Sequence, residues 1–402
     1  MAARASSRAG PAETTHGAVV SRAGSAALSA FDALCLAARP QPDITELDRA
    51  LRAGLDVDQL LSVASDHSVR PQLVRSLSAL GWDRVPPALR NDLENFMRVH
   101  GAFCLAAAEQ LGRVTAALAA RGLPVAVFKG AALAAALHRD LTAREYNDID
   151  LIVRPSDVDT AEDVLEGFGY RSTQGDRRFR KAFLAHQRQY ALVHADQATV
   201  DLHWAFTARH VPFPLSVDEI WSSVEQVAIG PRRVATIGGA ALALLLAGHG
   251  TKEGWRSLGW VCDFALLVDR QRDLDWLGVH RRARAQDCGD SVLLACVMAE
   301  RLLGVAVPEA LGPLAKASSR VDALASVLIA DLREPQGQDR RQNLADLDLC
   351  DSRWRRAVAS VAIGLAPTVS DHNAMPLPPV LWPLYRVTRP FRLGLKALGI
   401  GR

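Results

Sequence analysis

Two aspartates separated by one residue lie within an apolar segment of this chain. Asp148 and Asp150 alternate with Ile149, Leu151 and Val153. Because successive side chains of a strand point to opposite faces, both carboxylates share one face and the aliphatic side chains share the other. Their Cα atoms are then about 6.5 Å apart. Two negative charges this close repel each other unless a cation lies between them, so the pattern indicates a site for a divalent ion such as Mg²⁺.

A third carboxylate belongs to a later segment with the same alternation. Asp201 and His203 share one face of an expected strand at residues 199–204, and the apolar residues share the other. Residues 187–194 are expected to form its antiparallel partner across a short turn. If the strand with Asp201 lies beside the strand that begins at Val125, the three carboxylates meet at one edge of a sheet.

An anion site is indicated just before the aspartates. The hydrophobic segment 125–128 runs into Lys129 and Gly130, and an alanine-rich helix is expected at residues 131–138. Glycine lets a phosphate come close to the backbone, and a helix N-terminus offers free N–H groups and partial positive charge. Lys129 adds a full charge. This order of segments suits a nucleoside triphosphate held on Mg²⁺.

Helical segments flank this stretch on both sides. Pro86-Pro87 is expected to open a long helix that Gly122 ends, and Ser156 is expected to cap a helix that ends at Gly167. From Ser216 onward the helical period dominates. We therefore expect an α+β, mainly helical chain with five parts: a disordered tail (1–25), an N-terminal helical region (26–122), a small mixed-sheet core (123–236), a C-terminal helical domain (237–366), and a Pro-rich segment with a basic C-terminal helix (367–402).

Composition limits the possible partners. The 402 residues suffice for two or three domains, and contents of 49% hydrophobic and 23% charged residues are ordinary for a globular protein. A net charge of +3 is too weak to indicate a nucleic-acid partner, and no DNA partner is expected. The sequence has no Gly-rich dinucleotide fingerprint, Walker loop or zinc spacing.

The cysteines and the N-terminus indicate a cytoplasmic protein. None of the six cysteines forms a Cys-x-x-Cys pair, so free thiols in a reducing compartment are expected. Residues 1–25 lack the apolar segment of a secretory signal. The longest apolar run, at residues 239–248, is too short to span a bilayer.

Four groups of residues together resemble a known family. Phe128-Lys129-Gly130, Arg144, the Asp148–Leu151 segment and the Asp201–Trp204 segment are similar to the uncharacterised nucleotidyltransferase family of the DNA-polymerase-β-like nucleotidyltransferase superfamily. The resemblance continues to about Pro308 and includes, further along the chain, His249, Lys252, Trp255 and Asp263.

The resemblance implies a nucleotidyltransferase core at residues 123–236 with Mg²⁺, or alternatively Mn²⁺, on Asp148, Asp150 and Asp201. Most members of the wider superfamily have Gly-Ser where this chain has Gly130-Ala131. Lys129 is therefore expected to replace the missing hydroxyl, as in a branch that includes toxin-like nucleotidyltransferases.

We accordingly expect a transferase that moves a nucleoside monophosphate from an NTP, most simply ATP, to an unidentified hydroxyl acceptor with release of pyrophosphate. Lys129, Gly130 and Arg144 are expected to bind the phosphates. A surface salt bridge is the alternative for Arg144. Two other functions stay open: a nucleotide-binding interaction protein without catalysis, and a toxin-like enzyme that acts on RNA or protein.

Several polar residues outside this set are weaker candidates. His203, His249 and Lys252 form a second tier that could help to hold the nucleotide or the acceptor, and Asp263 is either a supporting partner or a structural ion pair. A basic patch at 177–181 could steer a phosphate, or it is a solvated loop. The basic helix near the C-terminus could contact an anionic membrane or a partner protein, or pack on the domain.

Overall fold

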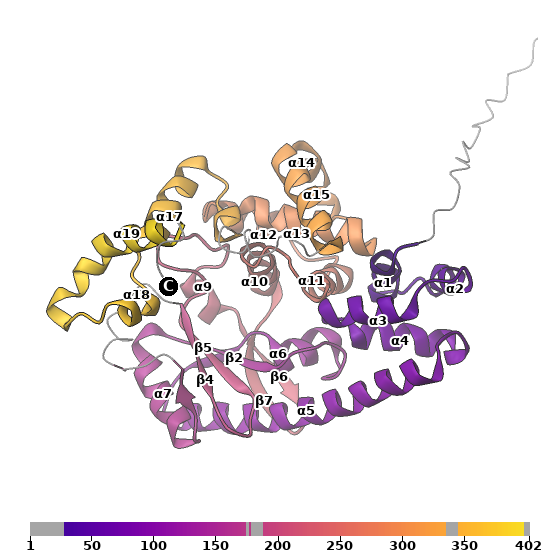
Figure 1. The fold of residues 1–402 in the computed structure, drawn as a ribbon, viewed down its shortest axis with the longest axis horizontal. Helices are drawn as coiled ribbons and strands as arrows, with labels where there is room; N and C mark the ends of the chain where they lie inside the picture. The colour runs from indigo at the N-terminus through magenta and orange to yellow at the C-terminus, as the bar shows by residue number, and fades with distance from the viewer. Residues whose placement is uncertain (1–27, 174–176, 178–187, 335–344, 398–402) are drawn as a thin grey trace, which may run out of the picture.

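A computed structural model describes residues 28–397 apart from 174–176, 178–187 and 335–344 (Figure 1). The expected tail at residues 1–25, most of the basic patch at 177–181 and the last five residues lie outside this part of the chain. The mainly helical α+β fold with a small mixed sheet is confirmed by the described residues.

A seven-stranded mixed sheet forms the centre of the described structure. Its strand order is β3-β4-β5-β2-β1-β7-β6. The strands are β1 (Val125–Val127), β2 (Asp148–Val153), β3 (Arg171–Ser172), β4 (Gln189–Val193), β5 (Thr199–His203), β6 (Val224–Ile229) and β7 (Arg232–Ile237).

The register of the central strands places the acidic residues together. Strand β5 runs parallel to β2, with Asp201 directly opposite Asp150. The expected β4–β5 hairpin is confirmed as an antiparallel pair. The arrangement that we considered for β5, directly beside β1, is not found: β1 pairs antiparallel with β2, so β2 lies between β1 and β5. Strand β5 instead lies directly beside β2, the strand that carries the Asp-x-Asp pair. This pairing places Asp201 next to Asp150.

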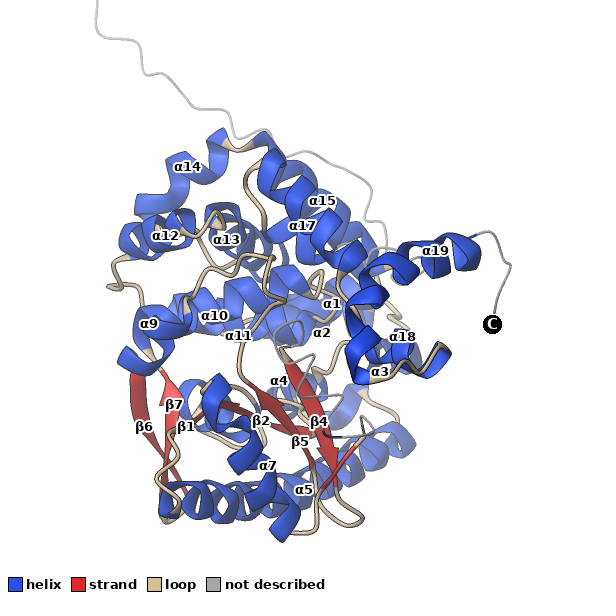
Figure 2. Ribbon diagram, turned by 90° about the vertical axis from the view of Figure 1, so that its left-hand side faces the viewer, coloured by secondary structure: helices blue, strands red, loops and turns tan. Residues whose placement is uncertain are grey.

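Both faces of β2 are covered, by two separate layers of helices. Leu151 and Val153 pack with side chains of α5 (Pro87–Ala120) and α7 (Val158–Gly167) on one face. Ile152, two residues after Asp150 and on the same side of the strand, belongs to the core formed with the C-terminal helices. Figure 2 shows α5 beneath the sheet and α10 and α11 above it. The face of β2 that carries the aspartates is therefore turned towards the C-terminal helices.

The long helix α5 begins as the sequence indicates. Pro87 occupies its first turn, where the missing N–H is not needed, and the chain leaves it through Gly122 at a φ of +70°. It runs the length of the sheet in Figure 1. The helices before it pack instead against the C-terminal helical layer and share its core. They are α1 (Ala30–Ala38), α2 (Ile44–Arg52), α3 (Val57–Asp66), α4 (Arg70–Leu80) and the short η1 (Trp82–Arg84).

The C-terminal layer is built around two buried helices, α10 (Gly239–Lys252) and α13 (Gly289–Leu303). Among the described residues, no helix combines the length and apolarity needed to cross a membrane. The remaining elements are α9 (Val217–Ser222), α11 (Leu258–Arg270), α12 (Trp276–Ala285), η4 (Glu309–Leu311), α14 (Gly312–Ala317), α15 (Ser319–Arg333), η5 (Ala345–Leu349), α17 (Arg353–Leu365), α18 (Val369–Ala374), η6 (Pro379–Leu384) and α19 (Tyr385–Ala397).

One local expectation, the cap of α7, was wrong. Ser156 does not cap α7, because it lies within a 3-10 turn, η3 (Pro155–Asp157), and its hydroxyl donates to the Asp157 carboxylate. The helix expected at residues 131–138 is confirmed, although its second half is wound more widely than an α-helix. It consists of one α-turn, α6 (Gly130–Leu133), and one wider π-turn, η2 (Ala134–His138).

Candidate active site

The Lys-Gly corner lies where β1 ends and α6 begins. Gly130 has a φ of +52°, in the left-handed region that glycine tolerates best. A Cβ at this position would lie 3.2 Å from the backbone oxygen of Asp148 and 3.7 Å from the ring of Tyr146. The corner therefore requires glycine for both its backbone angle and its close approach to the start of β2. Lys129 reaches from this corner to Asp150, with 3.2 Å between Nζ and Oδ1.

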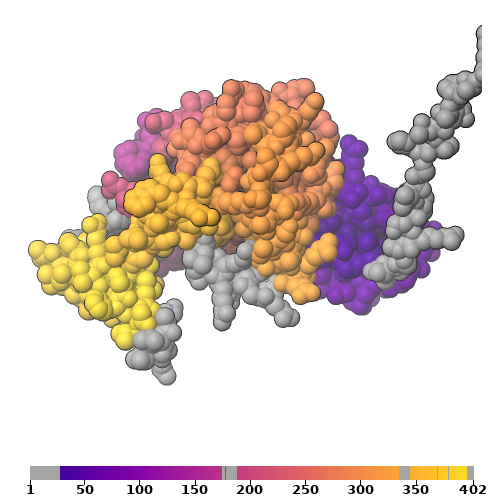
Figure 3. Space-filling model, turned by 90° about the horizontal axis from the view of Figure 1, so that it is seen from above, coloured from indigo at the N-terminus to yellow at the C-terminus, as the bar shows by residue number. Residues whose placement is uncertain are grey.

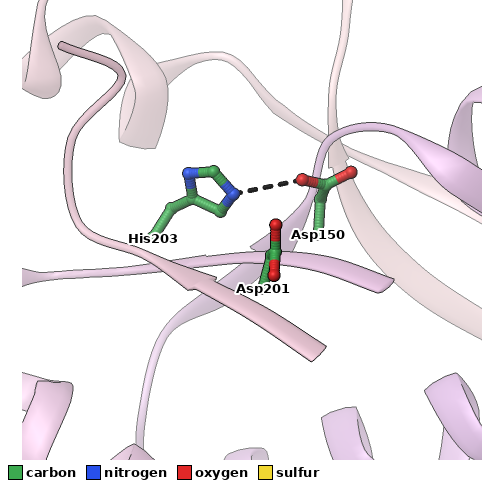
Figure 4. A group of neighbouring side chains, drawn as sticks. All are labelled: Asp150, Asp201 and His203. Carbon is green, nitrogen blue, oxygen red and sulfur yellow. Dashed lines mark hydrogen bonds and ion pairs between the residues drawn. The ribbon is translucent and has the colours of Figure 1, made fainter. Parts of the chain in front are cut away.

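Asp150, Asp201 and His203 form a compact group of ligand atoms (Figure 4). One side-chain donor atom from each lies within 4.8 Å of the others. His203 Nε2 is 3.1 Å from Asp150 Oδ1, and Gln189 on β4 donates to Asp201 Oδ2 at 3.1 Å. Two carboxylates and an imidazole from neighbouring parallel strands can hold a divalent cation.

The charge states of Asp150, Asp201 and His203 are compatible with binding of a cation. Burial raises the pKa of Asp150, but Lys129 and His203 outweigh burial and hold it well below its usual range. Burial and then the charge of Asp150 raise the pKa of Asp201. Burial lowers the pKa of His203 to about 4, so its imidazole is neutral at pH 7 and able to bind a metal. The other ring nitrogen of His203, Nδ1, is buried and has no hydrogen-bond partner among the described residues.

Asp148 lies beside this group but is not part of it. It is half-buried at the start of β2, opposite Thr199, and it lines the adjoining cavity. Burial and the neighbouring Asp150 charge raise the pKa of Asp148 to about 6. A carboxylate with this environment becomes more stable when a cation approaches.

Arg144 lies neither on the surface nor within the group formed by Asp150, Asp201 and His203. Its guanidinium is buried and pairs with Asp263 on α11, at 3.0 Å from Nη2 to Oδ2. His138 completes the contact, at 2.8 Å from Nε2 to Asp263 Oδ1. Arg144 Nη1 also donates to the Gly130 carbonyl at 3.5 Å. The arginine therefore ties the Lys-Gly corner to the C-terminal helical layer, and Asp263 is its ion-pair partner.

His249 and Lys252 lie on the same helix but have different surroundings. α10 continues through Gly248 and Gly250, which allow close packing: a Cβ on Gly250 would lie 2.5 Å from the Trp255 ring. His249 lines the cavity and meets the Trp260 ring edge-on, with 5.2 Å between ring centroids. Burial lowers its pKa well below the usual value.

Lys252 lies in a buried polar cluster on the side of Asp201. Its Nζ donates to the Phe206 carbonyl at 3.2 Å and lies 3.4 Å from Glu253 Oε1. Burial, followed by the charge of Arg188, lowers the pKa of Lys252 to about 8. The lysine also lowers the pKa of Asp201 through its charge, so it adds positive potential behind the carboxylates.

A cavity of about 640 Å³ opens next to the carboxylates. It lies between β2, α5 and α11, and several aromatic side chains form its wall. Arg70 and Glu145, which form an ion pair with each other, also line it. Its lining includes Lys129, Gly130, Arg144, Asp148, Asp150, Asp263, His249, Phe96, His100, Phe103, Tyr146, Asn147 and Trp260.

Sequence patterns missed two parts of this arrangement. Gln189 reaches Asp201 only because the hairpin places β4 beside β5, and an isolated glutamine gives no signal of that contact. The Arg70–Glu145 pair joins residues 75 positions apart. Of the basic patch, the structure describes Arg177 alone, and its guanidinium pairs with Asp163 at 2.6 Å, on the outer side of α7.

Comparison with known families shows to which family the chain belongs. A family model described as uncharacterised nucleotidyltransferase matches residues 53–304, more than half of the chain. The chain belongs to this family. It is therefore a nucleotidyltransferase, an enzyme that transfers a nucleoside monophosphate. No curated protein matches the sequence.

The nucleotidyltransferase is also similar to two solved structures. A solution structure of the antibiotic-resistance factor ANT(2'')-Ia is 17% identical over 58% of this chain and 97% of that chain, with a TM-score of 0.26. The crystal structure of ANT(2'')-Ia in complex with adenylyl-2''-tobramycin is 16% identical over 56% of this chain and 97% of that chain, with a TM-score of 0.25.

Proposed function

We propose that this enzyme uses a divalent cation, Mg²⁺ or Mn²⁺, to transfer the nucleoside monophosphate of an NTP to a hydroxyl-bearing acceptor. ATP is the expected donor. The observation that carries the proposal is the convergence of Asp150, Asp201 and His203 next to the Lys129-Gly130 corner. The six cysteines are free and buried, which suits a reaction in the reducing cytoplasm.

The residues present fit a divalent cation. Asp150 and Asp201 provide carboxylate oxygens, His203 provides a neutral nitrogen, and the raised pKa of Asp148 marks a carboxylate that a cation would stabilise. In this structure the positive charge beside Asp150 is the Lys129 ammonium group. When bound, the metal would supply Lewis-acid stabilisation of the charge on the triphosphate.

The protein groups then divide the remaining work. We assign phosphate binding to Lys129 and the Gly130 amide, because both residues line the cavity together with Asp150. Asp201 is held by Gln189 and has a raised pKa, so it suits the removal of the acceptor proton. The acceptor oxygen forms a bond to the α-phosphorus, the bond to the β-phosphate oxygen breaks, and pyrophosphate leaves.

Arg144 has a different role in this proposal from the one that the sequence indicated. Its guanidinium is engaged with Asp263, so it positions the Gly130 carbonyl and the cavity wall. A phosphate could attract it only by competing with a buried carboxylate. We therefore assign phosphate binding chiefly to Lys129 and Gly130.

The test is transfer of label from NTPs radiolabelled at the α-phosphate into a cell extract, with each NTP given in turn. Asp150→Asn and Asp201→Asn should each lower incorporation by about 10²-fold or more, because each removes a charge at the reacting phosphate. Asp196→Asn, in the exposed turn of the same hairpin, is the matched control and should keep full activity. Incorporation that survives in both site variants would remove the proposal.

A further inference from the structure

Helix α17 presents an apolar stripe to solvent. Trp354, Val358, Val361 and Leu365 follow one another at spacings of four, three and four residues, which places them on one face of the helix. All four are exposed, and Trp354 keeps 76% of its surface accessible. A helix of a globular domain normally turns such a stripe to the core, and here no described residue buries it.

Helix α19 and the residue before it repeat this arrangement. Leu384, Val387, Phe391 and Leu395 are three, four and four residues apart, and all four are exposed. Phe391 keeps 71% of its surface accessible. α19 packs against α17, so two exposed apolar stripes belong to one structural unit. We name residues 351–397 the C-terminal lobe; in Figure 3 its yellow part projects from one side of the molecule.

The charged residues of α19 explain why its apolar stripe faces outward. Arg389 and Arg392 turn inward and hold the buried carboxylate of Asp371, at 2.8 and 2.7 Å. Asp371 in turn accepts hydrogen bonds from the backbone and hydroxyl of Thr368 at the start of α18. The inward side of α19 therefore carries charged groups, and its outward side carries apolar side chains. In an ordinary surface helix the apolar side chains face inward and the charged ones face outward.

The remaining charge of this region has one sign. Residues 351–402 contain eight Lys or Arg and two Asp, a formal charge of +6, so the rest of the chain carries −3 of the total of +3. Asp371 is bound by the two arginines, and Asp351 accepts the backbone N–H groups of Gly289 and Asp290. Exposed Arg353 and Arg355 flank Trp354, and exposed Arg386 precedes Val387 in the α19 stripe.

We propose that the C-terminal lobe binds the surface of an anionic lipid bilayer. Its apolar stripes would enter the boundary between headgroups and acyl chains, where tryptophan is favoured, and the arginines would contact anionic headgroups. Single-sign charge beside apolar side chains favours a lipid surface over a protein partner, whose interface has a mixed and specific pattern. The protein lies on the bilayer and does not cross it.

The experiment is flotation of the full chain with vesicles. One vesicle type contains phosphatidylglycerol and phosphatidylcholine, and the other contains phosphatidylcholine alone. Wild-type protein should float with the anionic vesicles at 0.1 M salt, and high salt should weaken that binding. The pairs Val387→Ser/Phe391→Ser and Trp354→Ser/Val361→Ser should each reduce partitioning about tenfold or more, since each removes two membrane-facing apolar groups.

Matched controls separate the lobe from general exposure. Leu105→Ser removes an apolar side chain that is 68% exposed on α5 and should leave flotation unchanged. Arg353→Glu/Arg386→Glu should lower binding, whereas Arg281→Glu on α12 should not. The sites are exposed, so the fold should persist, which melting curves check.

Several outcomes would overturn the proposal. Absence of wild-type binding to anionic vesicles would do so, whatever the variants show. Equal binding to both vesicle types, or stripe variants that bind like wild type, would also contradict it. If the wild-type protein does not bind vesicles, but Phe391→Ser abolishes its self-association or its binding to a protein partner, the stripes serve protein contact instead.

Discussion

Arg144 and Asp263 form a buried ion pair between residues 119 positions apart. Arg144 belongs to the loop before β2, and Asp263 belongs to α11 in the C-terminal layer. His138, which ends the π-turn after α6, contacts the same carboxylate. This pair therefore fixes the sheet, with its carboxylates, against the helices that form the opposite wall of the cavity.

Removal of one partner of this pair should be costly. Asp263→Ala leaves the Arg144 guanidinium buried and unpaired, so the free energy of unfolding should fall by about 3–5 kcal/mol. Denaturant titration of the variant and of wild type measures it. The double variant Arg144→Met/Asp263→Leu should recover much of the loss, because it buries no charge; a double variant as unstable as Asp263→Ala would argue against this explanation.

The same carboxylate should make stability sensitive to acid. Burial raises the pKa of Asp263, but Arg144 and His138 outweigh burial and lower it. A carboxyl with a lowered folded-state pKa contributes stability above its unfolded pKa of about 3.9, and loses it as pH falls through the folded value. Denaturant titrations between pH 7 and pH 3 should show this loss in wild type and a smaller one in Asp263→Asn.

Asp148 should have the opposite pH dependence. Its folded pKa of about 6 lies above the unfolded value, so its ionisation destabilises the protein as pH rises from about 4 to 6. Asp148→Asn should therefore raise the free energy of unfolding at pH 7.5 by roughly 1–3 kcal/mol in the absence of divalent ions. Millimolar Mg²⁺ should reduce the difference in the free energy of unfolding between Asp148→Asn and wild type. A stability unchanged by the substitution at pH 7.5 would contradict the raised pKa.

Gly130→Ala should distort the Lys-Gly corner. A Cβ there meets the Asp148 backbone oxygen at 3.2 Å, and the φ of +52° is unfavourable for alanine. We expect a loss of about 1–2 kcal/mol in stability, together with weaker nucleotide binding in calorimetry. Gly122→Ala is the matched control, because its φ is +70° but no atom lies within 4 Å of its Cβ position. Equal effects on nucleotide binding would show that backbone strain alone is responsible.

Alanine substitutions of Gly250 in α10 and of Gly364 in α17 should change the stability of the protein in opposite directions. Gly250→Ala places a Cβ 2.5 Å from the buried Trp255 ring and should destabilise the protein by about 1–3 kcal/mol. Gly364→Ala in α17 meets nothing within 4 Å and should stabilise the helix by about 0.5–1 kcal/mol. Thermal melting of both variants beside wild type distinguishes packing from helix propensity.

Local alternation was enough to predict several parts of this site. The period-two pattern of residues 148–153 and 199–203 correctly put the aspartates on strands, and the turn at 195–198 correctly indicated the β4–β5 hairpin. Pro86-Pro87 and Gly122 marked the ends of α5. These features depend on residues close in sequence, whose backbone preferences act without knowledge of the rest of the fold.

Contacts between distant segments could not be predicted in this way. The order of the strands put β5 beside β2, which selected His203 and not Asp148 for the compact group with Asp150 and Asp201. The partner of Arg144 depends on how α11 docks on the sheet, and nothing near Arg144 in sequence indicates Asp263. The failed cap at Ser156 has a local cause, since Pro155 starts a 3-10 turn that delays the helix to Val158.

The most direct test of the central claim is electron paramagnetic resonance of Mn²⁺ bound to the protein with ATP. We predict a bound Mn²⁺ signal in wild type that Asp150→Asn and Asp201→Asn both weaken strongly, and a nitrogen coupling that disappears in His203→Asn. A bound signal that is the same in wild type, Asp150→Asn and Asp201→Asn would contradict the account, as would a wild-type protein that binds no Mn²⁺.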